Sequence, residues 1–280
     1  MPVEHRVADA VKTALTYASI IVACLIAAFP LVVIVMASLK TSTEFNGGPV
    51  LAPPGNWLNI DNFVTAFVRG KMLTAFINTT FTLIVSVVGT VIIGSMAAYA
   101  IARFDFRGRR VVIFLFLLAA IVPGITAQVA TFQIVNQLEL FNTRWSAIAL
   151  FIGTDIVSIY IFIQFMRGIP KALDEAALLD GASHFRIYRS VILPLLVPAI
   201  VTVVIIKGVA IYNEFYIPFL YMPSPDLGVV ATTLFRFKGP YQTEWEVIAA
   251  GVVITIIPTL ILFLALQRWV YRGFTRGAVK

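Results

Sequence analysis

Long apolar stretches alternate with shorter polar segments along this chain of 280 residues. A hydrocarbon core about 30 Å thick is crossed by roughly 20 apolar residues in a helix, and six stretches of the sequence reach that length. They are Ala14 to Leu39, Thr79 to Ile101, Val111 to about Thr131, Trp145 to Met166, Val191 to Tyr212, and Val247 to Val270. A transmembrane β-barrel would show alternating segments of about 10 residues instead. The pattern therefore predicts an all-α, polytopic membrane protein with six transmembrane helices.

The chain carries no strict internal repeat, no low-complexity tract and no linker long enough to separate two domains. We therefore expect a single transmembrane domain over residues 1–280. The first apolar stretch follows Arg6 and Lys12, as the apolar part of a signal peptide would. Its length of about 25 residues and the lack of a convincing small-x-small cleavage site favour a retained membrane anchor.

The small fraction of charged residues supports a membrane protein, and the placement of Lys and Arg predicts its orientation in the membrane. Charged residues make up 12% of the chain, against about 25% in an ordinary soluble domain. The net charge of +7 could suggest nucleic acid, but most of the 21 Lys and Arg residues fall in alternate loops. Cytoplasmic loops of membrane proteins are enriched in these residues. We therefore expect a multi-pass protein of the cytoplasmic (inner or plasma) membrane, with both termini in the cytoplasm and no nucleic-acid partner.

The residues that usually carry catalysis or metal binding are sparse. Cys24 is the lone cysteine and lies within the first apolar stretch, while His5 and His184 are too isolated to suggest a metal site. The chain has no Gly-rich phosphate loop ending in Lys-Ser or Lys-Thr, so it does not bind ATP through that motif. We expect no enzymatic activity and no cofactor bound by this chain.

A polar segment separates the fourth and fifth apolar stretches and has strong helix signals. Pro170 suits a first helical position, and Asp174 and Glu175 lie early in the helix, where they favour its dipole. Gly181 follows as a left-handed cap would require, and Ser183 can cap a second helix. The sequence predicts a short helix, a tight reversal and a second helix, all on the cytoplasmic side.

The composition of this segment favours docking of a protein partner. Ala176 and Ala177 share a face with Leu173, and their small side chains allow close approach. Glu175 offers a carboxylate to an Arg or a helix N-terminus of the partner. The alternative is an interfacial helix resting on lipid headgroups, but an Ala pair is a weak anchor and Phe185 is the first large aromatic residue.

The same segment resembles a known sequence motif. Glu175-Ala176-Ala177, Gly181 after three further residues and Val191-Ile192-Leu193-Pro194 after nine resemble the EAA loop of permease subunits of binding-protein-dependent ABC importers. The chain is most similar to the MalG-like carbohydrate-uptake branch, over about residues 30 to 280. Further matching segments are Ser38 to Lys40, Ala97 to Arg109, Ile121 to Pro123, Leu140 to Thr143, Asn213 to Phe215, and Gln267 to Lys280. Modest departures are Thr79, Glu139, Val191 and Tyr212.

The resemblance implies a MetI-like, type I fold and a set of partners. One permease of an ATP-driven importer of mono- or oligosaccharides would pair with a second homologous permease. Two cytoplasmic ATPase subunits would hold ATP and Mg, and an extracytoplasmic sugar-binding protein would deliver the solute. The coupling loop would cover residues 170–194. The residues implied in ATPase coupling are Asp174, Glu175, Ala176, Ala177, Asp180, Gly181 and Ala182, with a further contact at Gly277, Ala278, Val279 and Lys280.

Candidates for the solute pathway come from polar residues within or beside the apolar stretches. Asp155 lies about halfway through the fourth stretch, where a charge costs about 2.5–3.5 kcal/mol on insertion scales. It should therefore face a cavity or a partner, which could be Lys207 unless that side chain snorkels outward. Asn213 and Glu214 lie at the outer mouth, and Asn78 and Gln128 are lesser options.

Other functions fit parts of this sequence. A secondary, ion-coupled solute transporter would need broken helices or a repeated set of buried ionisable groups. A membrane scaffold would explain Asp155 as packing alone. An ABC permease for a non-sugar solute shares the coupling loop, although the C-terminal tail and residues 103–109 favour carbohydrate.

Overall fold

The computed structural model describes residues 3–49, 51–153, 155–239 and 243–278. Helices dominate these ranges, which contain no β-strand beyond an isolated bridge between Lys238 and Thr243. The predicted all-α fold is therefore confirmed. The chain divides into two compact units, residues 1–72 with 234–262 and residues 73–233 with 263–280, and each is described by itself.

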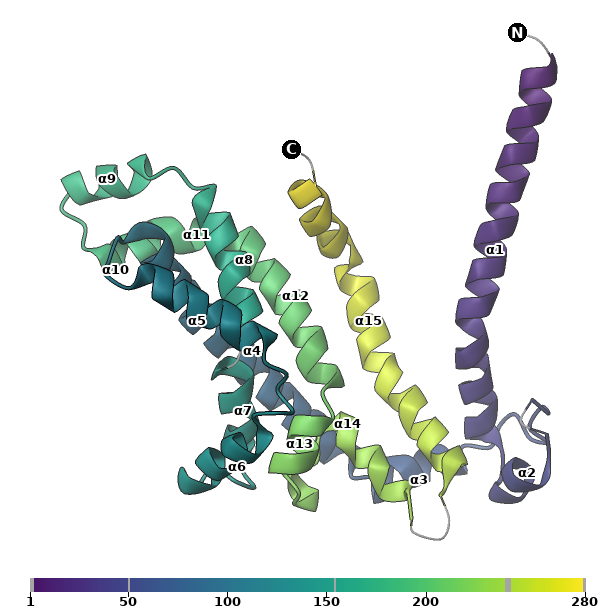
Figure 1. Cartoon of the computed structure of the whole chain (residues 1–280). Coiled ribbons are helices and arrows are strands. Elements are labelled where there is room, and N and C mark those ends of the chain that lie inside the picture. Colours follow the sequence, from purple (N-terminus) through teal and green to yellow (C-terminus); the bar gives the residue numbers. More distant parts are fainter. Residues whose placement is uncertain (1–2, 50, 154, 240–242, 279–280) are drawn as a thin grey trace. The chain divides into compact units, whose positions relative to one another are not determined.

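The first unit combines the start of the chain with the beginning of its last helix (Figure 1). Its helices are α1 (Val3–Leu39), α2 (Ser42–Gly47), α3 (Asp61–Arg69), the 3-10 turn η3 (Leu234–Phe237) and the first part of α15 (Trp245–Ala278). Asn62 ties α3 to the end of α1, because its side-chain amide donates to the carbonyls of Ser38 (2.9 Å) and Lys40 (2.7 Å). These bonds satisfy carbonyls that the end of a helix leaves without intrahelical partners.

A capping box folds the polar segment that follows α1. Thr41 Oγ1 accepts a hydrogen bond from the Glu44 N–H, and the Glu44 carboxylate accepts from the N–H groups of Thr41 (2.8 Å) and Gly55 (3.1 Å). The hydrogen bond from the Thr41 N–H is the main reason why the pKa of Glu44 lies below its ordinary value. Glu44 therefore joins α2 to the loop around Gly55.

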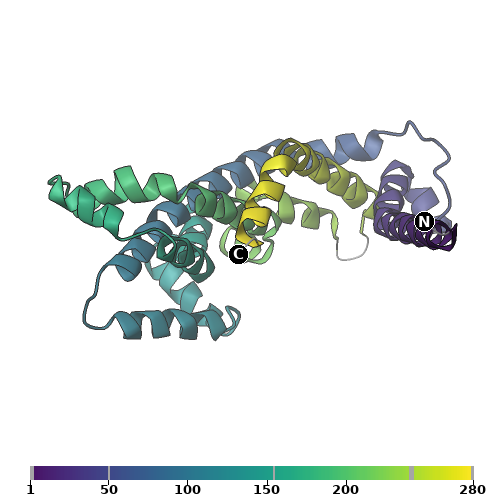
Figure 2. The ribbon, with the colours of Figure 1, turned by 90° about the horizontal axis from the view of Figure 1, so that it is seen from above.

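The second unit contains most of the remaining helices. They are α4 (Met72–Arg103), α5 (Arg109–Ile121), α6 (Gln128–Gln137), α7 (Arg144–Gly153), α8 (Ile156–Arg167), α9 (Ala172–Leu179), α10 (His184–Ile187), η1 (Tyr188–Ile192), α11 (Leu193–Leu195), α12 (Val197–Asn213), α13 (Tyr216–Tyr221), η2 (Pro225–Leu227) and α14 (Val230–Thr233). Its main core joins α4, α8, η1 and α12 through buried side chains that include Ala98, Phe162, Ile192 and Val203. This core places α9 and α10 beyond the end of α8, at one extremity of the unit in both views (Figures 1 and 2).

Two helices of the described chain have the length and apolar composition of a membrane span, and the number rises to four if bent helix pairs are counted. Residues Lys12–Leu39 and Met72–Arg103 qualify as single helices. Two further spans arise if each bent pair, α7 with α8 and the 184–195 helices with α12, is counted as one. The last helix contributes a shorter apolar part, Trp245–Ile261.

The third predicted span is shorter in the structure than in the sequence analysis. The helix was expected to continue from Val111 to about Thr131, but α5 ends at Ile121 and α6 begins only at Gln128. Val122 has an extended backbone (φ −70°, ψ 119°) directly before Pro123. A proline disfavours helical geometry at the residue before it and lacks an N–H to continue the helical bonding. Pro123 therefore explains the break.

Candidate functional site

The short helix predicted in the polar segment between the fourth and fifth stretches is α9, and its end has the expected geometry. Gly181 has a left-handed backbone (φ +80°), which a residue with a Cβ adopts only at a cost. The N–H of Gly181 donates to the Leu178 carbonyl (3.0 Å), and the N–H of Ala182 donates to the Ala177 carbonyl (3.0 Å). Ser183 Oγ then caps α10 by accepting from the Arg186 N–H. The predicted reversal between the two helices is confirmed.

One face of α9 is exposed and carries a carboxylate among apolar side chains. Glu175 and Ala176 are exposed, as is Asp180 directly after the helix. Leu178 is also exposed, and Leu179 is 90% exposed. Leu179 lies outside the set of residues implied in ATPase coupling by the resemblance, although Leu178 and Leu179 stand directly before the reversal in an otherwise polar segment.

The opposite face of α9 packs against the chain itself. Ala177 and Ala182 are half-buried and pack against the main core of the second unit. Asp174 is largely buried, and its Oδ2 lies 3.1 Å from Nη2 of Arg103 at the end of α4. The structure thus divides the residues implied in ATPase coupling into an exposed set, with Glu175, Ala176 and Asp180, and an inward set, with Asp174, Ala177 and Ala182. Arg103 could not be assigned to this site from its residue type, because a basic residue at the inner end of a span is common.

A second group of charges lies inside the predicted fourth and fifth spans. Asp155 stands in the bend of 42° between α7 and α8 and caps α8, accepting from the Ser158 N–H (3.4 Å) and the Ser158 hydroxyl (2.5 Å). Lys207 of α12 places its Nζ 3.4 Å from Asp155 Oδ2, and the two side chains are 14% and 9% exposed, respectively. The partner that the sequence suggested for Asp155 is therefore the one that the structure supplies.

The polar candidates at the end of α12 make local hydrogen bonds. The side-chain amide of Asn213 donates to the Val209 carbonyl one turn earlier (2.9 Å). Glu214 Oε1 accepts from the N–H groups of Tyr216 (2.8 Å) and Ile217 (3.2 Å), and so caps the start of α13. Gln128 accepts a hydrogen bond from the Tyr216 hydroxyl. Asn213 remains exposed, so its side chain is accessible to a solute.

Asn78 is better explained by packing than by solute contact. It is fully buried in α4, and its amide nitrogen donates to the carbonyls of Asp226 (2.8 Å) and Gly228 (3.0 Å). Its Oδ1 accepts from Nε of Arg144 (2.9 Å). One amide therefore holds α4, the start of α7 and the 225–228 turn together, and both of its donors are used.

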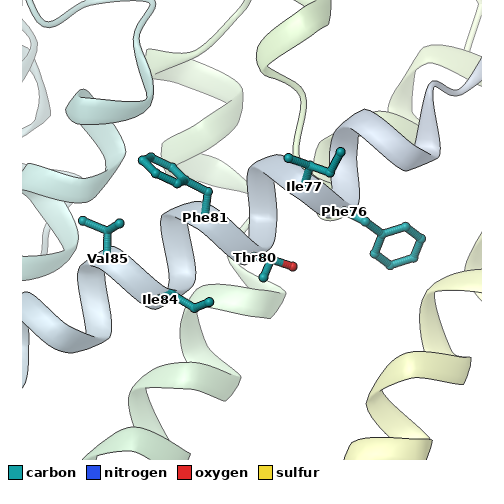
Figure 3. Close-up of a pocket in the computed structure, with 6 residues that line it drawn as sticks. All are labelled: Phe76, Ile77, Thr80, Phe81, Ile84 and Val85. Carbon is teal, nitrogen blue, oxygen red and sulfur yellow. The ribbon is translucent and has the colours of Figure 1, made fainter.

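The exposed side of α4 forms an open apolar groove (Figure 3). Its lining comes entirely from this helix and consists of Phe76, Ile77, Thr80, Phe81, Ile84 and Val85. In a membrane span such a face is solvated by lipid tails, which are as apolar as Leu.

The structure describes only two of the four C-terminal residues implied in ATPase contact. Gly277 and Ala278 belong to the last turn of α15, and Val279 and Lys280 lie outside the described residues.

Comparison with known proteins agrees with this architecture. The family described as "Binding-protein-dependent transport system inner membrane component" matches residues 64–276. The arabinooligosaccharides transport system permease protein AraQ of Halalkalibacterium halodurans is 34% identical over 258 residues, which cover 91% of this chain and 92% of that protein. The melibiose/raffinose/stachyose import permease protein MelC of Bacillus subtilis is 31% identical, with 95% of this chain and 96% of that protein covered.

Solved structures support the fold. A chain in the crystal structure of a bacterial ABC transporter involved in the import of the acidic polysaccharide alginate superposes with a TM-score of 0.79. It is 20% identical in sequence, and the match covers 96% of this chain and 98% of that one. The chain belongs to the family of inner membrane components of binding-protein-dependent transport systems.

Proposed function

We propose that this chain is a permease subunit of an ATP-driven sugar importer, spanning the cytoplasmic membrane six times with both termini in the cytoplasm. The names of its relatives support a sugar as solute, since AraQ and MelC are transport proteins for arabinooligosaccharides and for melibiose, raffinose and stachyose. The distribution of Lys and Arg residues supports the orientation. The chain is a transport subunit and not itself an enzyme.

The exposed face of α9 is the proposed contact through which ATP hydrolysis on a partner subunit is coupled to transport. It presents Leu178 and Leu179 to the surroundings, with the carboxylates of Glu175 and, directly after the helix, Asp180 nearby. An apolar patch rimmed by polar groups is typical of a protein interaction site. A separate cytoplasmic ATPase would cover this patch, pair an Arg with Glu175, and hold the ATP and Mg that drive transport.

The remaining partners follow from the same assignment. A second homologous permease would complete the pathway, and an extracytoplasmic binding protein would deliver the sugar; one structural relative was crystallised with an alginate pentasaccharide-bound periplasmic protein. Asn213 and Glu214 are candidates for contacts at the outer mouth. Asp155 and Lys207 would act in the pathway as a neutral pair, since each side chain already has the other as its partner.

An energy-source experiment tests the function. Cells with and without this chain are given radiolabelled arabinotriose, melibiose, raffinose and stachyose, and uptake is measured after arsenate or a protonophore. Uptake of one of these sugars should require the chain and stop when arsenate depletes ATP. Uptake that survives ATP depletion but collapses with the proton gradient would identify a secondary transporter instead.

A further inference from the structure

The coupling segment is attached to the inner end of α4 by one buried charge contact. The side chain of Arg103 donates from Nη2 to the carbonyl of Ile169 (3.0 Å), just before α9. The same Nη2 lies 3.1 Å from Oδ2 of Asp174, and the side chains of Arg103 and Asp174 are 7% and 14% exposed. Arg103 therefore holds both the approach to α9 and its first turn.

Aromatic contacts continue this attachment beyond the reversal. Phe104, directly after α4, packs edge-on against His184 with ring centroids 5.0 Å apart. Tyr99 contacts Tyr188 with a centroid distance of 5.5 Å. The hydroxyl of Tyr188 is 2.7 Å from Oγ of Ser95 in a buried hydrogen bond. Both arms of the helix-turn-helix segment thus rest on the last turns of one helix.

The charge contact makes the position of α9 specific. Among the described residues, neither Nε of Arg103 nor either carboxylate oxygen of Asp174 has a well-directed hydrogen bond. The 3.1 Å approach of Nη2 to Oδ2 is therefore an ionic contact without ideal hydrogen-bond geometry. Removal of either residue leaves a buried charge uncompensated, which is strongly unfavourable. The pair consequently favours one position of α9 against the end of α4, called its seating below, over positions in which the helix is shifted along α4 or separated from it.

We propose that Arg103 and Asp174 are positioning residues that fix α9 to α4, so that the coupling helix and this span move as one body. This inference rests on the proposed coupling function of α9. It reassigns Asp174 from contact with the ATPase to support of the coupling helix, and it adds Arg103, which contributes nothing to the exposed face. Glu175 and Leu179 remain available to the partner on the other side of α9.

Hydrogen exchange in a charge-swap series tests the seating. The full-length permease, in lipid nanodiscs and together with its co-purified ATPase, is prepared as Arg103→Asp, Asp174→Arg and the double swap. Amide exchange of residues 172–179 should rise by about tenfold or more in each single variant, because the interaction energy of a contacting pair spans that range. The double swap should exchange more slowly than either single variant, because it restores the charge pairing with reversed signs. It should not reach the parent value, because an Asp at position 103 cannot donate to the Ile169 carbonyl.

A milder series protects the test against misfolding. Arg103→Gln, Asp174→Asn and their combination remove charge without reversing it, and the double variant should exchange more slowly than either single one. Asp105→Asn is the matched control, because Asp105 pairs with Arg109 at 2.7 Å on the same side but is 87% exposed. Its exchange over 172–179 should match the parent.

Two outcomes overturn the seating. Either the single variants in both series leave exchange over 172–179 unchanged, or the double variants are no better than the worse single ones. The proposed function fails separately: if Glu175→Arg retains the ATPase, α9 is not the coupling helix, whatever the exchange data show for Arg103 and Asp174.

Discussion

Lys207 Nζ, in the predominantly apolar helix α12, lies 3.4 Å from Oδ2 of Asp155, the residue directly before α8. The contact joins α12 to the bend between α7 and α8, where Asp155 also caps α8 through Ser158. Two charges that would each be costly in the membrane therefore neutralise one another. The bend in the predicted fourth span is a place where backbone groups are freed, and Asp155 supplies a partner for one of them.

This pair predicts a marked loss of stability when one charge is removed. Lys207→Met leaves the Asp155 carboxylate buried without its partner, which typically costs about 3–5 kcal/mol. The double variant Lys207→Met/Asp155→Asn should lose clearly less, because no isolated charge remains. Thermal unfolding in nanodiscs, followed by circular dichroism, measures both. A double variant at least as unstable as Lys207→Met would show that the two side chains do not compensate one another.

Asn78 should be equally sensitive, for a different reason. Asn78→Leu removes three hydrogen bonds, two to the carbonyls of Asp226 and Gly228 and one from Nε of Arg144, and each hydrogen bond contributes about 0.5–1.5 kcal/mol. We expect a large drop in the melting temperature. Thr80→Val is the control on the same helix, because Thr80 is exposed in the groove of Figure 3; its melting temperature should stay close to the parent value. Equal effects of the two substitutions would contradict the anchoring role of Asn78.

An exposed ion pair should matter much less. Arg69 bonds both carboxylate oxygens of Glu244 (2.9 and 3.0 Å), but the two side chains are 61% and 34% exposed. Exposed pairs contribute about 0–1 kcal/mol, because water and salt screen the charges. Arg69→Gln should therefore shift the melting temperature by far less than Asn78→Leu does. A shift of similar size would mean that this pair is more strongly coupled than its exposure indicates.

The reversal after α9 depends on the glycine backbone and not on space. A Cβ at Gly181 would meet no atom within 4 Å, yet its φ is +80°. Gly181→Ala should therefore cost about 1–2 kcal/mol through backbone strain alone. Gly168→Ala is the matched control, since Gly168 ends α8 with φ −79°. Hydrogen exchange over residues 172–187 should rise in the first variant and not in the second; the reverse order would refute the strain argument.

The sequence predicted local features of the site better than long-range ones. Gly181 and Ser183 act through nearby backbone, so their residue types alone were enough to locate the reversal after α9 and the cap of α10. Pro170 was predicted at the first helical position, but it lies two residues before Ala172, where α9 begins. Pro123 lies inside the third predicted span, and the predicted helix continues across it because the hydrophobic run continues. Periodicity cannot distinguish a continuous span from a broken one when both are apolar.

Most contacts between residues far apart in the chain could not be predicted from the sequence. The partner of Asp155 could be suggested because the predicted spans hold only two basic residues, Lys207 and Arg268, and Arg268 lies at the end of its span. Arg103 offered no such contrast, since the positive-inside rule already accounts for a basic residue at its position. The inward direction of the Asp174 side chain could not be predicted either. Adjacent residues of a helix point about 100° apart, but the sequence alone does not decide whether Asp174 or Glu175 faces inward.

The proposed function requires the exposed face of α9 to bind a separate ATPase through Glu175. The most direct test is affinity purification of the tagged chain from its native host in mild detergent, with mass spectrometry of the proteins that co-elute. Three forms are compared: the parent, Glu175→Arg, and Asp105→Arg as a control at an exposed acid outside the coupling segment. We expect an ATPase and a second permease to co-elute with the parent and the control, and only the ATPase to be lost with Glu175→Arg. Equal recovery of the ATPase with all three forms, or its absence from the parent under conditions that preserve other complexes, would contradict the proposed function.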